Sequence, residues 1–245
     1  RRRRLLAGLA VVVLAIALLG LATRRRDDPD PGGRTNPSGI QQAADAPSTT
    51  SVVTRSTTTS AAATTTTMPA PIPTGRFALA PGGTAVVGAG GRIYRYRVEV
   101  EEGTGVDPVT FAAAVDQTLG DRRGWITADG ISVQRVSDGT ADFSIRLATP
   151  PTTDLLCLPL DTEGQVSCGR NNMAVINLTR WLVGADPPKL ALADYRNYVV
   201  THEVGHLLGH PHVDCPGPGQ PAPIMMQQTY SIGACAPNAW PLPDA

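Results

Sequence analysis

The carboxyl-terminal part of the chain, from about residue 75 onward, predicts a single domain of the α+β class. Residues 92–101 alternate apolar side chains with charged ones, which is typical of a β-strand that buries one face. Residues 107–119 begin with the pair Asp-Pro, a helix cap followed by a first-turn proline, and they end before a glycine. A longer helical stretch follows near residues 190–208. A length of about 170 residues suits one domain.

Short apolar runs between these two helices predict the remaining strands. Residues 131–136 and 143–148 have the length and composition of two short strands, and residues 174–178 those of a buried strand. A hairpin-like region precedes this last strand at residues 165–168. The expected order is therefore strand, helix, strands and helix. An irregular segment rich in proline and glycine follows Gly209.

Residues 1–26 predict a segment that meets a membrane. Residues 5–22 are apolar and uncharged, with four arginines before them and three after. As a helix this stretch would span roughly 27 Å, close to the ~30 Å thickness of the hydrocarbon layer. The small residues at 20 and 22 also fit a signal-peptide cleavage site. We expect an uncleaved single-pass anchor in the cell membrane, with cleavage and secretion as the alternative.

Residues 27–74 predict a disordered linker. Threonine, serine, proline and alanine dominate its composition, so it offers too little apolar surface to form a core. We expect this linker to separate the domain of residues 75–245 from the membrane. The formal net charge of zero gives no reason to expect binding to polyanions, so we expect no nucleic-acid partner. We also expect the protein to be a monomer.

All four histidines of the chain fall within residues 202–212. On a helix, His202 and His206 are separated by ~6 Å of rise and only ~40° of rotation. Both imidazoles therefore project from one face and can hold a single metal ion. Glu203 lies ~100° round the helix, where it can reach a water at the metal without being a ligand. This His-Glu-x-x-His pattern is typical of zinc hydrolases.

A third histidine ligand requires the helix to end. In a continued helix, His212 would lie ~240° round and ~9 Å beyond His206, facing away from the ion. Gly209 can adopt the left-handed conformation and turn the chain back, and Pro211 then prevents the helix from resuming. His212 can thus complete a three-histidine site that keeps its fourth position open.

Two neighbouring side chains are alternatives to this third ligand. His210 fits better as an exposed loop histidine, and His210 or Asp214 would replace His212 only if the turn were unusual. A structural zinc site would more often contain cysteine and fill all four positions. Three histidines beside an unliganded Glu203 favour a catalytic site.

The complete stretch His-Glu-x-x-His-x-x-Gly-x-x-His resembles the signature of the metzincin zinc peptidases. This resemblance implies a twisted, mixed five-stranded sheet with two main helices and a small irregular carboxyl-terminal subdomain. It also implies Zn²⁺ as cofactor and a peptide or protein as substrate, with Glu203 as the general base that activates the zinc-bound water. An edge strand near residues 165–170 would align an extended peptide by strand addition.

Metzincins carry a methionine in a tight turn beneath the metal. Residues 222–227, Ala-Pro-Ile-Met-Met-Gln, resemble that turn, with Met225 the better match and Met226 the alternative. A pair of methionines that simply fills the core is the plainer interpretation. Some metzincins have a tyrosine two residues after this methionine as an extra ligand. Gln227 or Gln228 stands there, so that feature is not carried over.

The proline- and glycine-rich connection and the Met-Met-Gln-Gln stretch in residues 216–228 also resemble a group of actinobacterial exported proteins. That group is catalogued as a domain of unknown function with metzincin features, and it implies no substrate. Two other functions stay open: a zinc amidase that acts on cell-wall peptides, and a non-catalytic envelope module stabilised by zinc. Glu203 argues against the second, because a structural site has no use for a buried carboxylate.

Four cysteines predict two disulfides, because an even number in an exported chain is typical of a disulfide framework. None belongs to a Cys-x-x-Cys pair. Pairing Cys157 with Cys168 and Cys215 with Cys235 is favoured, since each bridge then closes one irregular segment, and two other pairings stay open. Oxidised cysteines would place the domain outside the cytoplasm.

Overall fold

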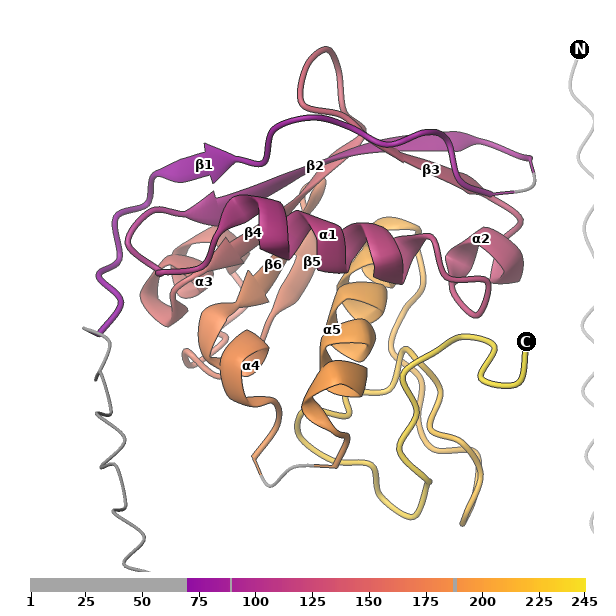
Figure 1. The fold of residues 1–245 in the computed structure, drawn as a ribbon. Coiled ribbons are helices and arrows are strands. Elements are labelled where there is room, and N and C mark those ends of the chain that lie inside the picture. Colours follow the sequence, from indigo (N-terminus) through magenta and orange to yellow (C-terminus); the bar gives the residue numbers. More distant parts are fainter. Residues whose placement is uncertain (1–69, 89, 187–188) are drawn as a thin grey trace, which may run out of the picture. The chain divides into compact units, whose positions relative to one another are not determined.

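A computed structural model describes residues 70–88, 90–186 and 189–245, and Figure 1 shows their arrangement. The expected membrane segment, residues 1–26, and all but the last five residues of the expected linker lie outside the described residues. No helix in the described part of the chain is long and apolar enough to cross a membrane.

The described strands form one mixed sheet. Its order is β1-β2-β4-β6-β5, with β3 paired to β2 beside this path. The pairs of β2 with β3, β2 with β4 and β4 with β6 are parallel, whereas β1 and β5 are antiparallel strands at the two edges. The strands are β1 (Phe77–Leu79), β2 (Ile93–Glu101), β3 (Ser132–Arg135), β4 (Phe143–Ala148), β5 (Cys168–Arg170) and β6 (Met173–Asn177).

The α+β class is confirmed, but the sheet has six strands in the described residues rather than the five expected. β1 is the additional strand, and the sequence does not indicate it because three residues are too few to show an alternating pattern. The expected strand at residues 165–170 is also shorter than predicted, since only Cys168–Arg170 pairs with β6.

Five helices occur in the described residues, two of them long. They are α1 (Pro108–Leu119), α2 (Trp125–Ala128), α3 (Pro150–Cys157), α4 (Leu178–Val183) and α5 (Leu192–Leu207). The predicted start of α1 is confirmed, because the Asp107 side chain accepts a hydrogen bond from the Thr110 N–H at 2.9 Å and Pro108 is the first helical residue. The three shorter helices are absent from the sequence-based expectation.

The main core lies between the sheet and the pair α1 and α5, which pack together against one of its faces (Figure 1). The inward-pointing residues of the central strands are fully apolar: Val98 and Val100, Ile145 and Leu147, and Ala174 and Ile176. A smaller cluster joins α3 to the opposite face around Cys157, Cys168 and Val175. The sheet is therefore covered on both faces at the end where β5 lies.

Helix α5 lies against β5 with no room for a side chain between them. A Cβ atom added to Gly169 would lie 2.1 Å from the backbone oxygen of Glu203 and 2.8 Å from the Cβ of His206. Glycine is required there because two backbones approach closely. This contact fixes the edge of the sheet beside the histidine-bearing part of α5.

Both favoured disulfide pairings are confirmed. Cys157 and Cys168 join the end of α3 to β5, with their Cα atoms 6.0 Å apart. Cys215 and Cys235, with Cα atoms 5.8 Å apart, close the segment after α5. Residues 208–245 contain no named helix or strand, in agreement with the irregular segment that the sequence predicts.

Candidate metal centre

Helix α5 ends at a turn built around Gly209, as predicted. The φ angle of Gly209 is +98°, a backbone conformation that favours glycine. The Gly209 N–H donates to the His206 oxygen at 3.1 Å, and the His210 N–H donates to the Gly205 oxygen at 3.0 Å. This pair of hydrogen bonds is the Schellman motif. It reverses the chain and carries His212 back toward the helix.

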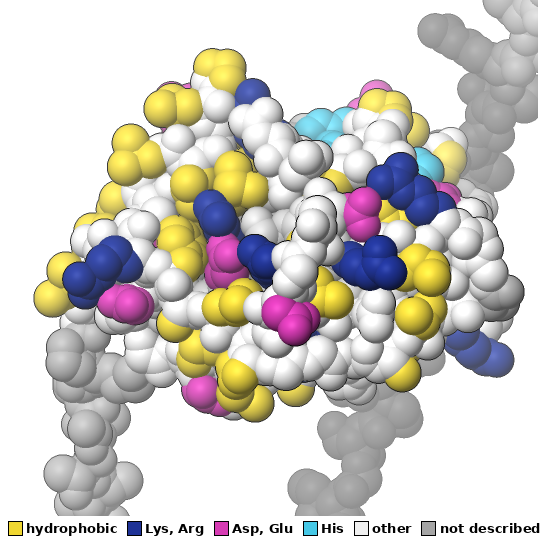
Figure 2. Space-filling view, turned by 90° about the horizontal axis from the view of Figure 1, so that it is seen from above, with side chains coloured by type: hydrophobic (Ala, Val, Ile, Leu, Met, Phe, Trp, Pro, Cys, Tyr) yellow, Lys and Arg dark blue, Asp and Glu magenta, His cyan; other side chains and the backbone are white. Residues whose placement is uncertain are grey.

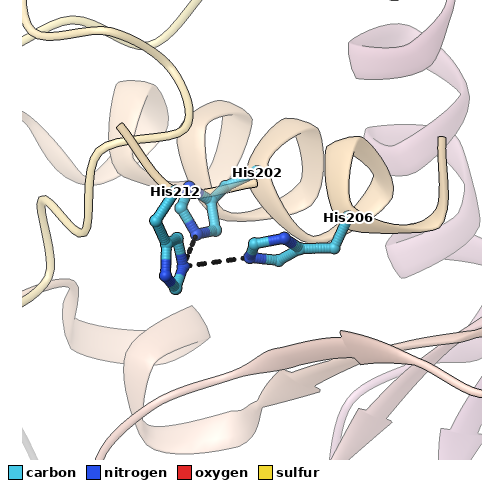
Figure 3. Close-up of side chains that lie close together, drawn as sticks. All are labelled: His202, His206 and His212. Atoms are coloured by element: carbon cyan, nitrogen blue, oxygen red, sulfur yellow. Dashed lines mark hydrogen bonds between the residues drawn. The ribbon is translucent and has the colours of Figure 1, made fainter. Parts of the chain in front are cut away.

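The three predicted ligands point toward one another (Figure 3). His212 Nε2 lies 3.3 Å from His202 Nε2 and 3.0 Å from His206 Nε2. Three nitrogens bound to zinc at ~2.05 Å with tetrahedral angles would lie about 3.3 Å apart. These three residues are also the one group of potential ligands found in the described residues that could hold a metal ion.

Backbone carbonyls fix the tautomers of two of the rings. His202 Nδ1 lies 2.8 Å from the Ile224 oxygen, and His206 Nδ1 lies 3.0 Å from the His210 oxygen. A carbonyl only accepts, so each Nδ1 carries the proton and each Nε2 presents a lone pair in the neutral ring. Two lone pairs directed at His212 Nε2 cannot both be satisfied by one N–H, whereas a cation satisfies all three nitrogens. The residues present therefore fit a metal ion.

Burial keeps these imidazoles neutral. The pKa of His202 is lowered from 6.5 to about 3, mainly by burial; the hydrogen bond to Ile224 opposes this shift, and the neighbouring His206 and His212 add to it. Burial is also the main cause that lowers the pKa of His206 and that of His212. Neutral imidazole is the form that binds metal ions, so no proton needs to be displaced at neutral pH.

Glu203 is a buried carboxylate in the same cleft. Its side chain is 5% exposed, and no hydrogen bond or ion pair to it occurs among the described residues. Burial alone raises the pKa of Glu203 from 4.5 to about 8. An unpaired buried carboxylate is costly, and a positive charge at the three histidines would favour its ionised form. Such a group is typical of a functional site rather than of a packed core.

Met225 packs beneath α5. A Cβ atom added to Gly205 would lie 2.5 Å from the Met225 sulfur, which shows how closely the turn approaches the helix. Met225 is 4% exposed, whereas Met226 is only partly buried and uses its backbone oxygen to accept from the Tyr198 hydroxyl at 3.0 Å. The contact favours Met225 over Met226 as the residue of the turn.

The two glutamines after these methionines differ in their surroundings. Gln228 is 1% exposed and exchanges two hydrogen bonds with the backbone of Asn238, at 2.7 and 3.0 Å. It holds the irregular segment together and does not reach the histidines. Gln227 is exposed and lines the cleft.

The histidines open into a cleft of about 290 Å³ between two rims. One rim is the segment before and including β5, with Leu160, Val166 and Gly169. The other is formed by Gln227, Thr229 and Tyr230, of which Tyr230 is 55% exposed. Each rim belongs to a segment closed by one disulfide. His212 is exposed and His206 partly exposed, so the site is accessible from solvent; Figure 2 shows histidine side chains at the molecular surface.

His210 lies in the loop after α5, as the sequence predicts, but its side chain is only partly exposed and has two partners. Its Nε2 lies 2.8 Å from Asp129 Oδ2, and its ring stacks on Trp125 with centroids 4.3 Å apart. Asp214 is exposed and outside the group of potential ligands. The sequence alone does not indicate Trp125 or Asp129, because Asp129 lies 81 positions before His210 and no local pattern marks either residue.

The fold and the site together define the class of this protein, an α+β domain whose three histidines can hold a metal ion. A family model described as "Protein of unknown function (DUF3152)" matches residues 64–240. The match covers more than half of the chain, and the chain belongs to this family. No curated protein matches it.

Proposed function

We propose that the chain is a zinc-dependent endopeptidase of the metzincin type that acts outside the cytoplasmic membrane. The observation that carries this proposal is the unpaired, buried carboxylate of Glu203 in the cleft that also holds the three converging imidazoles. A metal site that served stability alone would need the histidines but not the carboxylate. Three nitrogen ligands with an open fourth position are typical of catalytic zinc.

Each residue of the site then has a defined task. His202, His206 and His212 would hold Zn²⁺, which when bound lowers the pKa of a water to about 7 and polarises the scissile carbonyl. Glu203 accepts the proton of the attacking water and delivers it to the leaving amine. The carbonyl oxygens of Ile224 and His210 keep the first two rings oriented throughout.

The substrate side of the proposal rests on β5. Among the described strands β5 pairs with β6 alone, so its other edge could add an extended peptide. Gly169, at the middle of β5, brings that edge against the turn of α5 that carries Glu203 and His206. A peptide added there would pass the histidines in the cleft.

The two disulfides support an extracytoplasmic location, because such bonds persist in oxidising compartments. No free cysteine occurs in the described residues, so none competes for the metal. Membrane attachment through residues 1–26 remains part of the proposal.

The proposal is tested by incubating the purified protein with a peptide library, with an unfolded protein and with peptidoglycan. We expect cleavage of internal peptide bonds, its loss with a chelator, and its return when Zn²⁺ is added. Cleavage confined to peptidoglycan would favour a zinc amidase. Bound zinc without any hydrolysis would contradict the enzyme and leave a zinc-stabilised module.

A further inference from the structure

The turn that follows α5 is supported by a tryptophan from a distant part of the sequence. Trp125, the first residue of α2, is 7% exposed and its Nε1–H donates to the Thr201 oxygen of α5 at 2.8 Å. Its ring lies against Gly205, where an added Cβ atom would be 2.7 Å from Cζ2. The same ring stacks on His210, with an angle of 10° between the two planes.

These contacts replace a part of the Schellman motif that is missing here. An apolar contact commonly joins the residue after the left-handed position to the residue five places earlier. In this chain those residues are His210 and Gly205, and Gly205 has no side chain. Trp125 contacts both positions at once. The turn is therefore held from outside the helix.

Asp129 fixes the remaining freedom of His210. Its carboxylate oxygen accepts from His210 Nε2 at 2.8 Å, so stacking on Trp125 sets the plane of the ring and Asp129 sets its rotation. The Asp129 N–H donates to the Trp125 oxygen at 3.0 Å, so the two partners are the first residue and the C-cap of the short helix α2. We call Trp125, Asp129 and His210 the clamp.

The backbone of His210 links the clamp to the metal centre. The His210 oxygen accepts from His206 Nδ1 at 3.0 Å, and this hydrogen bond orients the His206 ring and keeps its Nε2 unprotonated. A shift of His210 would therefore misdirect the lone pair of a ligand that Asp129 itself does not touch.

We propose that Trp125 and Asp129 are positioning residues, which act through His210 to orient His206 as a metal ligand. The inference rests on the metal-binding half of the proposed function and is independent of hydrolysis. Partners that orient ligating histidines typically change metal affinity by about 10- to 100-fold when they are removed.

The test compares Asp129→Ala with Asp138→Ala, which removes an exposed aspartate between β3 and β4. Zinc affinity is measured by competition with a chelator, and the melting temperature is measured on the metal-free proteins. We expect Asp129→Ala to bind Zn²⁺ about 10-fold more weakly or worse, with a metal-free melting temperature close to that of the control. Equal zinc affinity in the two variants would overturn the clamp.

A double-mutant cycle shows whether the effect passes through His206. In a His206→Ala background, Asp129→Ala should weaken zinc binding by no further amount, because the ring that it orients is gone. A further loss as large as in the wild-type background would overturn the proposed path.

A readout without metal separates this inference from the proposed function. Nitrogen-15 NMR of the metal-free protein should show His206 as the Nδ1–H tautomer in wild type and a mixture of tautomers in Asp129→Ala. An unchanged tautomer would overturn the clamp. If the His206 tautomer differs between wild type and Asp129→Ala as expected, but wild type binds no zinc, the clamp stands and the proposed function fails.

Discussion

Residues 70–207 and residues 208–245 are stabilised in different ways. The first region buries apolar side chains between the sheet and the pair α1 and α5. The second has no named helix or strand and contributes only a few side chains to that core, Met225 among them. It is held by the Cys215–Cys235 disulfide and by hydrogen bonds such as those between Gln228 and Asn238.

The metal centre needs both regions. His202, His206 and Glu203 belong to the packed helix, whereas His212 and the carbonyl of Ile224 come from the irregular segment. The two helical ligands are therefore anchored in the packed core, with the clamp orienting the His206 ring, while the third ligand depends on one turn and one disulfide. Damage to either region should therefore affect the site in a distinguishable way.

The largest effect should come from filling the contact between α5 and β5. Gly169→Ala places a Cβ atom 2.1 Å from a backbone oxygen, so the strand and the helix must move apart. We expect a loss of about 3 kcal/mol or more in the free energy of unfolding, measured with urea. Gly217→Ala is the matched control in the irregular segment, because no atom lies within 4 Å of its added Cβ. A similar loss in both variants would contradict the comparison.

Removal of one disulfide should have the next largest effect. Replacing Cys215 and Cys235 by serine opens a loop with a sequence separation of 20 and should cost about 3 kcal/mol of stability. Zinc affinity should fall strongly while far-ultraviolet circular dichroism still reports the sheet and helices. The matched variant without Cys157 and Cys168 should keep His212 in place and lose less zinc affinity. Equal losses of zinc affinity in these two variants would mean that the metal site does not depend more on the irregular segment than on the region of α3 and β5.

A third effect concerns the pH dependence of the metal-free protein. The pKa of Glu203 is raised by folding. Between pH 4.5 and about 8 the folded chain therefore keeps a proton on Glu203 that the unfolded chain has already released. Stability from this group should therefore fall as pH rises through that window, by up to about 1.4 kcal/mol per pH unit. Glu203→Gln should lack this slope. His202, with its lowered pKa, gives the opposite slope below pH 6.5 in both proteins.

The check is urea unfolding in the presence of a chelator at several pH values. The difference in free energy of unfolding between wild type and Glu203→Gln should change steadily from pH 4.5 to 8. Parallel stability curves across that range would show that the carboxylate is not desolvated as described.

Local chemistry explains which elements could be predicted from the sequence. The start of α1 is fixed by Asp107 and Pro108, and the end of α5 by Gly209, each through its own backbone preferences. The pairing of cysteines nearest in sequence followed from the short loops that they close. Each of these features depends on a few residues that are close together in the chain, so the amino-acid sequence is enough to predict it.

Long-range contacts explain what could not be predicted. The helix α3 begins with two prolines and two threonines, so its sequence shows no clear apolar helical pattern. The strand β1 is recognised only through its pairing with β2. The roles of Gly169, Trp125 and Asp129 arise where segments far apart in sequence meet. Gln228 could not be assigned to the core either, because its partner Asn238 lies on another part of the irregular segment.

The central proposal is that Glu203 is a catalytic base and not a ligand of the metal. The most direct measurement is peptide hydrolysis by zinc-loaded Glu203→Gln, alongside its zinc content and with Glu163→Gln, an exposed glutamate, as control. We predict full zinc content and a rate lower by at least about 10²-fold, because the amide cannot accept the proton of water. Hydrolysis by Glu203→Gln at the rate of wild type would contradict the account.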